Sequence, residues 1–305
     1  MSKPTSNRRQ FLRTSAKTAA ISAVAVSLGD RLMAADAAAP EVLINHSVCK
    51  WCYNGIPLLD LCTAGKEFGL RSIELLSPAD AKIVQDQGLT CALITNPIVE
   101  TEKGVKVGGI QKAWNRVEHH KALLAAYENQ IAETKKLGLD NVICFSGNRD
   151  GMDDETGMKN CAEGMKKLMP IAEKHGVTIT MELLNSKVDH KDYMCDHSDW
   201  GVALSEMVGS ERFKLLYDIY HMQIMEGDVI STINKIKDHI SHYHTGGVPG
   251  RNEIDDTQEL NYAAIMRAIQ KTGFQGYVAQ EFIPKRDDKI GSLKQAIGIC
   301  TLVQD

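Results

Sequence analysis

Short apolar runs and amphipathic stretches alternate along the chain from Val42 to the C-terminus. Runs of about four to eight residues that are apolar, or that alternate apolar with polar, indicate strands. Between them, apolar residues recur every three or four positions, which indicates helices with one buried face. Several of these helical stretches are followed by a glycine, a common residue just after a helix, at Gly69, Gly138, Gly176 and Gly273.

The pattern predicts eight strands, at Val42–Val48, Ser72–Leu76, Thr90–Thr95, Asn141–Phe145, Val177–Leu184, Phe213–Tyr217, Ile240–His244 and Gly276–Phe282. It predicts helices after them, at Pro57–Phe68, before Gln87-Gly88, and at Trp114–Leu137, Glu155–His175, Cys195–Val208, Val229–Lys237, Asn261–Lys271 and Ile290–Val303. Strands that alternate with helices favour a parallel sheet, and eight such units predict an α/β fold, the closed (β/α)8 TIM barrel. The polar segment Pro97–Gly109 is expected to form a loop or lid over one end of this barrel.

The first 39 residues differ from the rest and predict an export signal. They contain the pair Arg8-Arg9, a mild apolar run over residues 18–28, and small residues with an Ala-Asp-Ala sequence at 35–37. This is the twin-arginine pattern, and the apolar run is too short for a membrane-spanning helix. We therefore expect a signal peptide at 1–39, one barrel domain at 40–305, export to the periplasm, and no stable membrane anchor. The alternative is an ordinary basic tail.

Composition and charge narrow the class of partner. The chain has 305 residues, of which 43% are hydrophobic, enough for one large core. Residues 1–39 contain six basic and two acidic residues, so their removal takes the formal net charge from −4 to −8. A domain this acidic is a poor partner for nucleic acid. We expect a small-molecule sugar or keto-acid substrate, and the sequence leaves open whether the protein forms a homo-oligomer.

Four residues at predicted strand ends suggest a metal site. Glu182, Asp218 and Glu281 each interrupt an apolar run at its C-terminal end, and His244 ends another strand. A single acid in such a place is usually a capping or ion-paired residue. Here, however, four consecutive strands would present Glu, Asp, His and Glu to one mouth of the barrel, where barrel active sites lie. Three carboxylates and one imidazole suit a divalent cation such as Mn²⁺ or Mg²⁺.

The segments around these residues resemble a known family. The run from His244 to Glu253, His-Thr-Gly-Gly-Val-Pro-Gly-Arg-Asn-Glu, and Glu-Leu-Asn-Tyr at 259–262 are similar to a Val-Pro-Gly-Arg…Gly-Glu-Ile-Asn-Tyr signature. That signature belongs to the hydroxypyruvate isomerase family of the xylose isomerase-like TIM barrel superfamily. Glu-Leu-Leu-Asn at 182–185 resembles that family's Glu-Pro-Leu-Asn, and Asp-Ile-Tyr-His at 218–221 resembles its Asp-x-x-His. The resemblance covers about residues 42–303.

The resemblance implies roles for individual residues. Glu182, Asp218, His244 and Glu281 fall on the family's metal positions, and Glu182 and Glu281 also fall on its acid/base pair. His221 and Arg251 fall on positions that contact substrate, and we expect Glu74, near the end of the second strand, to reach the same pocket. The implied activity is that of a metal-dependent intramolecular oxidoreductase, which interconverts hydroxypyruvate and 2-hydroxy-3-oxopropanoate through an enediolate.

Departures from the family pattern keep other functions open. His244 stands where hydroxypyruvate isomerases tend to have Gln and where the related ketose 3-epimerases have His. A ketose 3-epimerase or another sugar isomerase is therefore the alternative enzyme, and a non-catalytic exported sugar-binding barrel is the alternative outside catalysis. A DNA-repair nuclease is disfavoured by the acidic charge. Cys49-Lys-Trp-Cys52 lacks the helix start of a thioredoxin-like motif, and the remaining cysteines are expected to be buried thiols.

Overall fold

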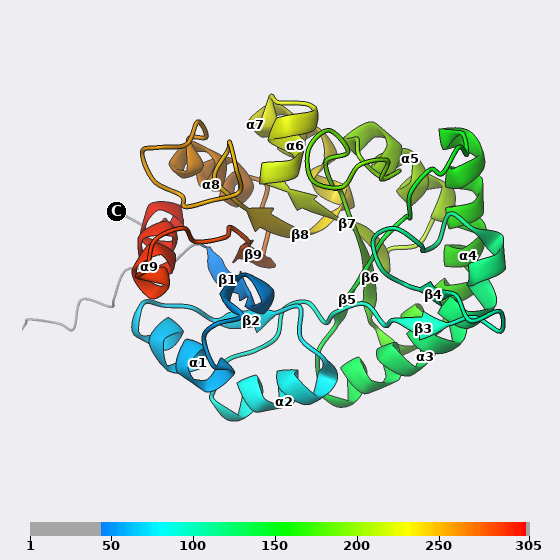
Figure 1. Ribbon diagram of the computed structural model, residues 1–305, viewed down its shortest axis with the longest axis horizontal. Helices are drawn as coiled ribbons and strands as arrows, with labels where there is room; N and C mark the ends of the chain where they lie inside the picture. Colours follow the sequence, from blue (N-terminus) through cyan, green and yellow to red (C-terminus); the bar gives the residue numbers. More distant parts are fainter. Residues whose placement is uncertain (1–43, 303–305) are drawn as a thin grey trace, which may run out of the picture. The chain divides into compact units, whose positions relative to one another are not determined.

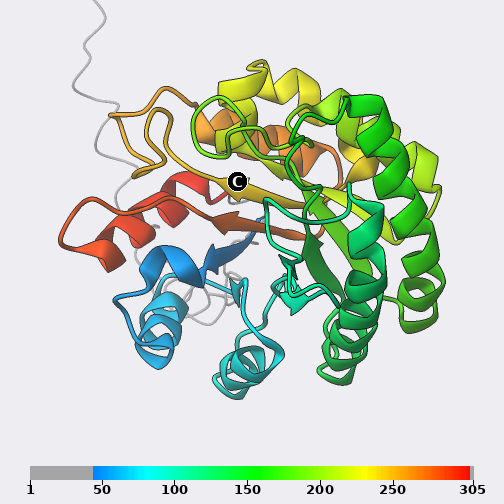
Figure 2. The same cartoon turned by 45° about the vertical axis from the view of Figure 1, so that its right-hand side comes forward.

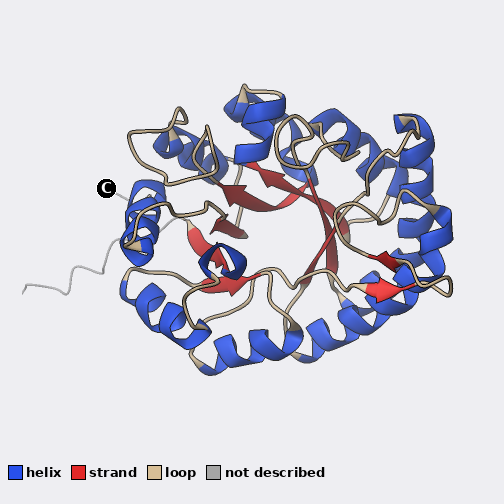
Figure 3. Ribbon diagram, viewed as in Figure 1, coloured by secondary structure: helices blue, strands red, loops and turns tan. Residues whose placement is uncertain are grey.

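The strands of the protein stand at the centre of a ring of helices (Figures 1 and 3). The computed structural model describes residues 44–302, so the expected signal peptide lies outside the described residues. Figure 2 shows the same arrangement turned by 45°, with helices outside the strands. None of the helices described in 44–302 has the length and apolar character needed to cross a membrane.

Within residues 44–302, seven parallel strands form one curled sheet in the order β2-β1-β9-β8-β7-β6-β5. Their bounds are β1 Asn45–Cys49, β2 Ser72–Glu74, β5 Asn141–Cys144, β6 Thr178–Glu182, β7 Phe213–Asp218, β8 Ile240–Thr245 and β9 Tyr277–Gln280. Apart from β1 and β9, neighbours in the sheet are consecutive predicted strands, as a TIM barrel requires. The predicted (β/α)8 TIM barrel is confirmed.

The segment Thr90–Thr95, predicted as a regular strand, closes the barrel but does not form a regular strand. Isolated bridges and hydrogen bonds join it to β2 on one side and to β5 on the other, including Leu75 N to Leu93 O (2.9 Å) and Ile143 N to Ile94 O (3.0 Å). At Ala92, side chains replace the backbone hydrogen bonds that a regular strand would make with its neighbours. Its N–H donates to the Ser72 hydroxyl (2.8 Å), and its carbonyl accepts from the Asn141 amide (3.2 Å). The prediction of a regular strand was therefore wrong, although the segment holds the expected place.

The helices follow the prediction in order and differ at several ends. Those on the outside are α1 Leu58–Glu67, α2 Pro78–Asp86, α3 His120–Lys136, α4 Asp154–His175, α5 Ser198–Val208, α7 Val229–Ile236, α8 Tyr262–Lys271 and α9 Lys289–Cys300, with short 3-10 turns at Lys50–Tyr53, Val117–His119 and Lys237–His239. The helix predicted from Trp114 starts later because Asn115 N bonds to Ser146 O (2.7 Å), which holds Trp114 and Asn115 in a turn next to the segment that follows β5. The helix predicted from Cys195 starts at Ser198.

Two elements were not predicted. Helix α6, Ile219–Met225, begins directly after β7, where the Asp218 side chain caps it by accepting from His221 N (3.0 Å). The polar segment after Pro97 contains a two-stranded antiparallel hairpin, β3 Val99–Glu100 and β4 Lys106–Val107. All eight cysteines are buried free thiols, so Cys49 and Cys52 form no disulfide in the described part of the chain.

Candidate active site

The four residues singled out by their spacing meet at the carboxyl ends of four adjacent strands. Glu182 ends β6, Asp218 ends β7, His244 lies in β8, and Glu281 follows β9. Asp218 and His244 are direct partners in the β7–β8 register. One ligand atom from each of the four lies within 4.8 Å of every other, and all four residues are buried. The structure thus brings together the predicted group, and its role as a set of metal ligands stays a prediction.

His244 stands at the centre of this group. Its Nδ1 lies 2.9 Å from Glu281 Oε2, 3.2 Å from Glu182 Oε1 and 3.9 Å from Asp218 Oδ2. The carboxylates strongly affect one another. Burial, and then the charge of Glu281, raise the pKa of both Glu182 and Asp218, whereas His244 and Arg251 outweigh burial and hold the pKa of Glu281 well below its usual range. Three buried carboxylates therefore share the positive charge of Arg251 and His244.

Two fully buried polar atoms in the same place lack a hydrogen-bond partner. They are Asp218 Oδ2 and His221 Nε2, which lie 3.8 Å apart. Buried polar atoms in folded proteins are nearly always satisfied, so an exception calls for a ligand or an ion. The crowded carboxylates, the single imidazole and the unpaired Asp218 oxygen together fit a hard or borderline divalent cation, held by Glu182, Asp218, His244 and Glu281.

His221 lies behind these residues and does not line the pocket in front of them. It is fully buried near the start of α6, and its Nδ1 accepts a hydrogen bond from Asn185 Nδ2 (2.6 Å). The Asn185 amide also donates to Asp189 Oδ2 (2.6 Å). Burial, and then the charge of Arg251, hold the pKa of His221 well below its usual value. The residue expected to touch substrate thus presents a neutral imidazole to Asp218.

Arg251 is part of the buried site and does not form a surface ion pair. Its Nη2 lies 2.5 Å from Glu281 Oε2 and 3.8 Å from Asp218 Oδ2. Its guanidinium lies 5.1 Å from the centre of the Trp51 ring and 5.4 Å from that of Tyr220. Arg251 has a φ of +57°, in the left-handed region, so the tight turn after Gly250 aims this side chain into the barrel.

Glu74 corrects one sequence-based prediction, because it does not reach the pocket. The residue is fully buried, and its Oε1 lies 2.7 Å from His242 Nε2 and 3.0 Å from His244 Nε2. Cys49 Sγ lies 3.6 Å from the same His244 nitrogen. Glu74 therefore contacts His244 on the side away from Glu182 and Glu281, and it fixes the plane of the ring. Glu74 is therefore not among the residues that line the pocket, contrary to what its strand-end position had suggested.

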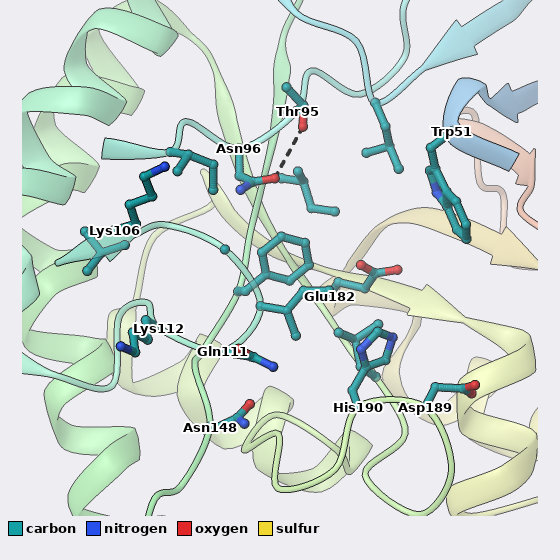
Figure 4. A pocket seen from close by; sticks show the side chains of 18 of the residues that line it. Trp51, Thr95, Asn96, Lys106, Gln111, Lys112, Asn148, Glu182, Asp189 and His190 are labelled. Atoms are coloured by element: carbon teal, nitrogen blue, oxygen red, sulfur yellow. Dashed lines mark hydrogen bonds between the residues drawn. The ribbon is translucent and has the colours of Figure 1, made fainter. Parts of the chain in front are cut away.

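A pocket of about 1010 Å³ opens in front of the acidic group (Figure 4). Glu182, Glu281 and Arg251 line its inner part, together with Trp51. The Trp51 indole was not identified from the sequence. Its Nε1 donates to Glu281 Oε1 (2.9 Å), and only the short spacing of Trp51 from the end of the first strand could have indicated it. Ile98, Lys106 and other residues of the segment after Pro97 line the outer wall, so this segment lies at the barrel mouth as expected.

Comparison with known proteins gives one family and several distant relatives. Residues 64–298 match the sequence profile of the xylose isomerase-like TIM barrel family. The chain is 26% identical over 257 residues to a 2-oxo-tetronate isomerase of Cupriavidus necator, covering 81% of this chain and 95% of that protein. It is 26% identical over 231 residues to a hydroxypyruvate isomerase of Escherichia coli, covering 73% and 86%. A crystal structure of an AP endonuclease of family 2 from Brucella melitensis superposes with a TM-score of 0.69 at 22% identity, covering 85% and 97%.

Proposed function

Because the chain belongs to the xylose isomerase-like TIM barrel family, we propose that it is a metal-dependent isomerase that interconverts hydroxypyruvate and 2-hydroxy-3-oxopropanoate through an enediolate. Relatives named 2-oxo-tetronate isomerase and hydroxypyruvate isomerase support an enzyme of the isomerase type that acts on a sugar or keto acid. One observation of this chain carries the proposal. Glu182 and Glu281 line the same pocket and contact His244 Nδ1 from different strands, at 3.2 and 2.9 Å.

The reaction moves a proton between two adjacent carbons, so it needs one group that accepts a proton and one that returns it. The two glutamates have opposite tendencies. His244 and Arg251 keep Glu281 ionised against the effect of burial, and burial together with Glu281 favours the protonated form of Glu182. Pairs of groups whose pKa values are pushed apart are typical acid/base pairs. We assign proton removal to the Glu281 carboxylate and proton return to Glu182.

Other residues of the chain support this pair. A divalent cation held by Glu182, Asp218, His244 and Glu281 would supply stabilisation of the negative charge that develops on the substrate oxygens. Trp51 donates to Glu281 Oε1 and so orients the carboxylate that removes the proton. Arg251 lies beside Glu281 at the inner end of the pocket, where its planar guanidinium suits the carboxylate of a keto acid.

A ketose 3-epimerase is the second candidate, and two observations favour it. The Arg251 guanidinium is already paired with Glu281 at 2.5 Å, so it is not free for a substrate carboxylate in this arrangement. His244 also stands at the position where the epimerases have His. An epimerase removes and returns a proton on one carbon with the same two glutamates, so the site chemistry is shared and the substrate decides between the two reactions.

The test is an isomerase assay on the purified protein with Mn²⁺ or Mg²⁺, and again after chelation. Hydroxypyruvate is compared with a panel of neutral ketoses. We expect turnover of hydroxypyruvate that depends on the metal and falls by about 10²–10⁴-fold in Glu182→Gln and in Glu281→Gln. Glu253→Gln, which changes a buried glutamate outside the group of four, is the matched control. Turnover of neutral ketoses alone would favour the epimerase, and bound metal without any turnover would favour a sugar-binding protein.

A further inference from the structure

The pocket is much larger than a three-carbon keto acid. Pockets of about 300–1,000 Å³ enclose drug-sized ligands, and this one has a volume of about 1010 Å³. The proposed acid/base residues, Glu182 and Glu281, are two of its many lining residues, and Glu182 lies well away from Lys106 and Lys112 (Figure 4). A substrate the size of hydroxypyruvate would leave the outer part without contacts. The size therefore points to a longer substrate whose reacting carbons lie at the inner end.

The outer part of this pocket carries positive charge. Lys106 in β4, Lys112 after it, and Lys191 in the loop after β6 all line the cavity. Within residues 44–302, none of these three ammonium groups lies within 4.0 Å of a carboxylate oxygen. Lys106 and Lys112 lie across the pocket from Trp51 in Figure 4, on the far side of Glu182. Lysines from two segments that line one cavity, with no carboxylate oxygen within 4.0 Å, suit an anionic group.

The acid and the amides that line the pocket are consistent with this ligand. Asp189 lies on the side away from Lys106 and Lys112 (Figure 4), and its Oδ2 already accepts from Asn185 Nδ2 (2.6 Å) and from Tyr220 OH (2.8 Å). Gln111 and Asn148 bring amide groups to the cavity between the lysines and Glu182, where hydroxyl groups of a sugar chain would need hydrogen-bond partners (Figure 4). The wall therefore combines free cations with neutral polar groups.

We propose that the substrate of this site is a ketose or keto acid of sugar length whose far end carries an anionic group, a phosphate or a carboxylate. Lys106, Lys112 and Lys191 bind this anion, while the carbons that exchange a proton lie between Glu182 and Glu281. This inference rests on the proposed isomerase function for the reaction itself. It adds the length of the substrate and the charge at its far end.

The experiment compares three six-carbon ketoses that differ only at the far end: D-fructose, D-fructose 6-phosphate and D-fructuronate. Steady-state kinetics of the full protein with Mn²⁺ give kcat/KM for each, beside hydroxypyruvate. We expect at least one anionic ketose to exceed both D-fructose and hydroxypyruvate by about ten-fold or more, with the advantage falling at high salt. The phosphate and the carboxylate are separate arms, so the better of the two identifies the anion.

Variants of the lysines test the assignment to these residues. In Lys106→Gln/Lys112→Gln/Lys191→Gln, the ratio of kcat/KM for the anionic ketose to that for D-fructose should fall toward one. Lys103→Gln, in the same hairpin but outside the cavity lining, is the matched control and should keep the ratio. A ratio that stays high in the triple variant would overturn the inference, as would equal kcat/KM for all three ketoses.

Binding separates a failure of this inference from a failure of the proposed function. Calorimetric titration of the same three ketoses into Glu281→Gln requires no turnover. Tighter binding of an anionic ketose that is lost in the triple lysine variant supports the anion site even if no isomerase activity is found. Equal binding of charged and neutral ketoses, in a protein that does turn over hydroxypyruvate, would overturn the anion site and leave the isomerase proposal standing.

Discussion

Replacing Glu74 with Gln should weaken metal binding. Burial alone would raise the pKa of Glu74, but His242 and then His244 lower it to about 2, so the carboxylate is ionised at neutral pH. It accepts from both imidazoles through Oε1, at 2.7 and 3.0 Å. A glutamine of the same shape can accept the same two bonds through its carbonyl oxygen. What the substitution removes is the charge.

The size of the effect follows from the two contacts. Hydrogen bonds to a charged group contribute roughly 1 kcal/mol more than neutral ones, and only one of the two acts on His244. That bond fixes the His244 ring with Nδ1 toward Glu182 and Glu281. About 1 kcal/mol corresponds to a change of roughly five-fold in affinity, below the roughly 10–100-fold typical for residues that orient metal ligands. Because the lowered pKa of Glu74 means that its charge stabilises the folded protein, the melting temperature should fall as well.

The assay is calorimetric titration of Mn²⁺ into chelator-treated protein, with a melting curve of the same samples. The control is Asp196→Asn, which alters another buried carboxylate, one that pairs with Arg149 at 3.1 Å. It should lower the melting temperature and keep the affinity for Mn²⁺. An affinity of Glu74→Gln within two-fold of the original protein would refute the idea that Glu74 orients a metal ligand. A loss of stability that matches that of Asp196→Asn, with affinity for Mn²⁺ lost only in Glu74→Gln, would support it.

Three further predictions concern stability. Burial, and then Arg71, lower the pKa of His46 from 6.5 to about 4. The protein should therefore lose stability as the pH falls from 6.5 toward 4, by up to about 3 kcal/mol. Urea denaturation at pH 5 and 7.5 should show this loss in the original protein and almost none in His46→Gln. Gly164→Ala would place a Cβ 2.6 Å from a Trp114 ring carbon and should destabilise the fold by about 1–3 kcal/mol. Gly298→Ala lies in open space in α9 and should stabilise the fold by up to about 1 kcal/mol. Melting curves compare the two variants, and equal shifts would contradict the packing argument. Mn²⁺ at about 100 times its dissociation constant should stabilise by about 2.7 kcal/mol, reversed by chelation, and no shift would argue against a bound cation.

The parts of the fold that were predicted depend on local patterns. The switch between short apolar runs and amphipathic stretches gave the order of strands and helices, and Gly176 ends α4 at a φ of +67° as its place in the sequence indicated. The errors arose where distant side chains decide the backbone. Ala92 has an ordinary strand sequence around it, yet Ser72 and Asn141 bind its peptide groups. Asp218 was identified as a strand end, and its second role as the cap of α6 depends on how tightly the chain turns there.

Some features of the candidate site were likewise predicted from the sequence, and others were not. Regular spacing of one strand and one helix was enough to bring Glu182, Asp218 and Glu281 together, because parallel strands end at one mouth. The contacts of Glu74 were mistaken because a strand-end acid can point into the mouth or beneath it, and periodicity does not distinguish these. Trp51 was missed because its bond to Glu281 joins segments 230 residues apart. Spacing thus identifies which strands contribute, while side-chain direction depends on the packed barrel.

Arg251 pairs with buried carboxylates, whereas the three pocket lysines form no ion pair with the described residues. Burial opposes the charge of Arg251, but Glu281 and Asp218 outweigh it and raise its pKa, so its guanidinium serves first to neutralise the buried acids. It can turn to a substrate carboxylate only when another cation balances Glu281. Binding of a short keto acid at Arg251 is therefore linked to the metal. Lys106, Lys112 and Lys191 lie within 4.0 Å of no carboxylate oxygen in the described chain, so an anion at the far end of a longer substrate would bind them whether or not the metal is present.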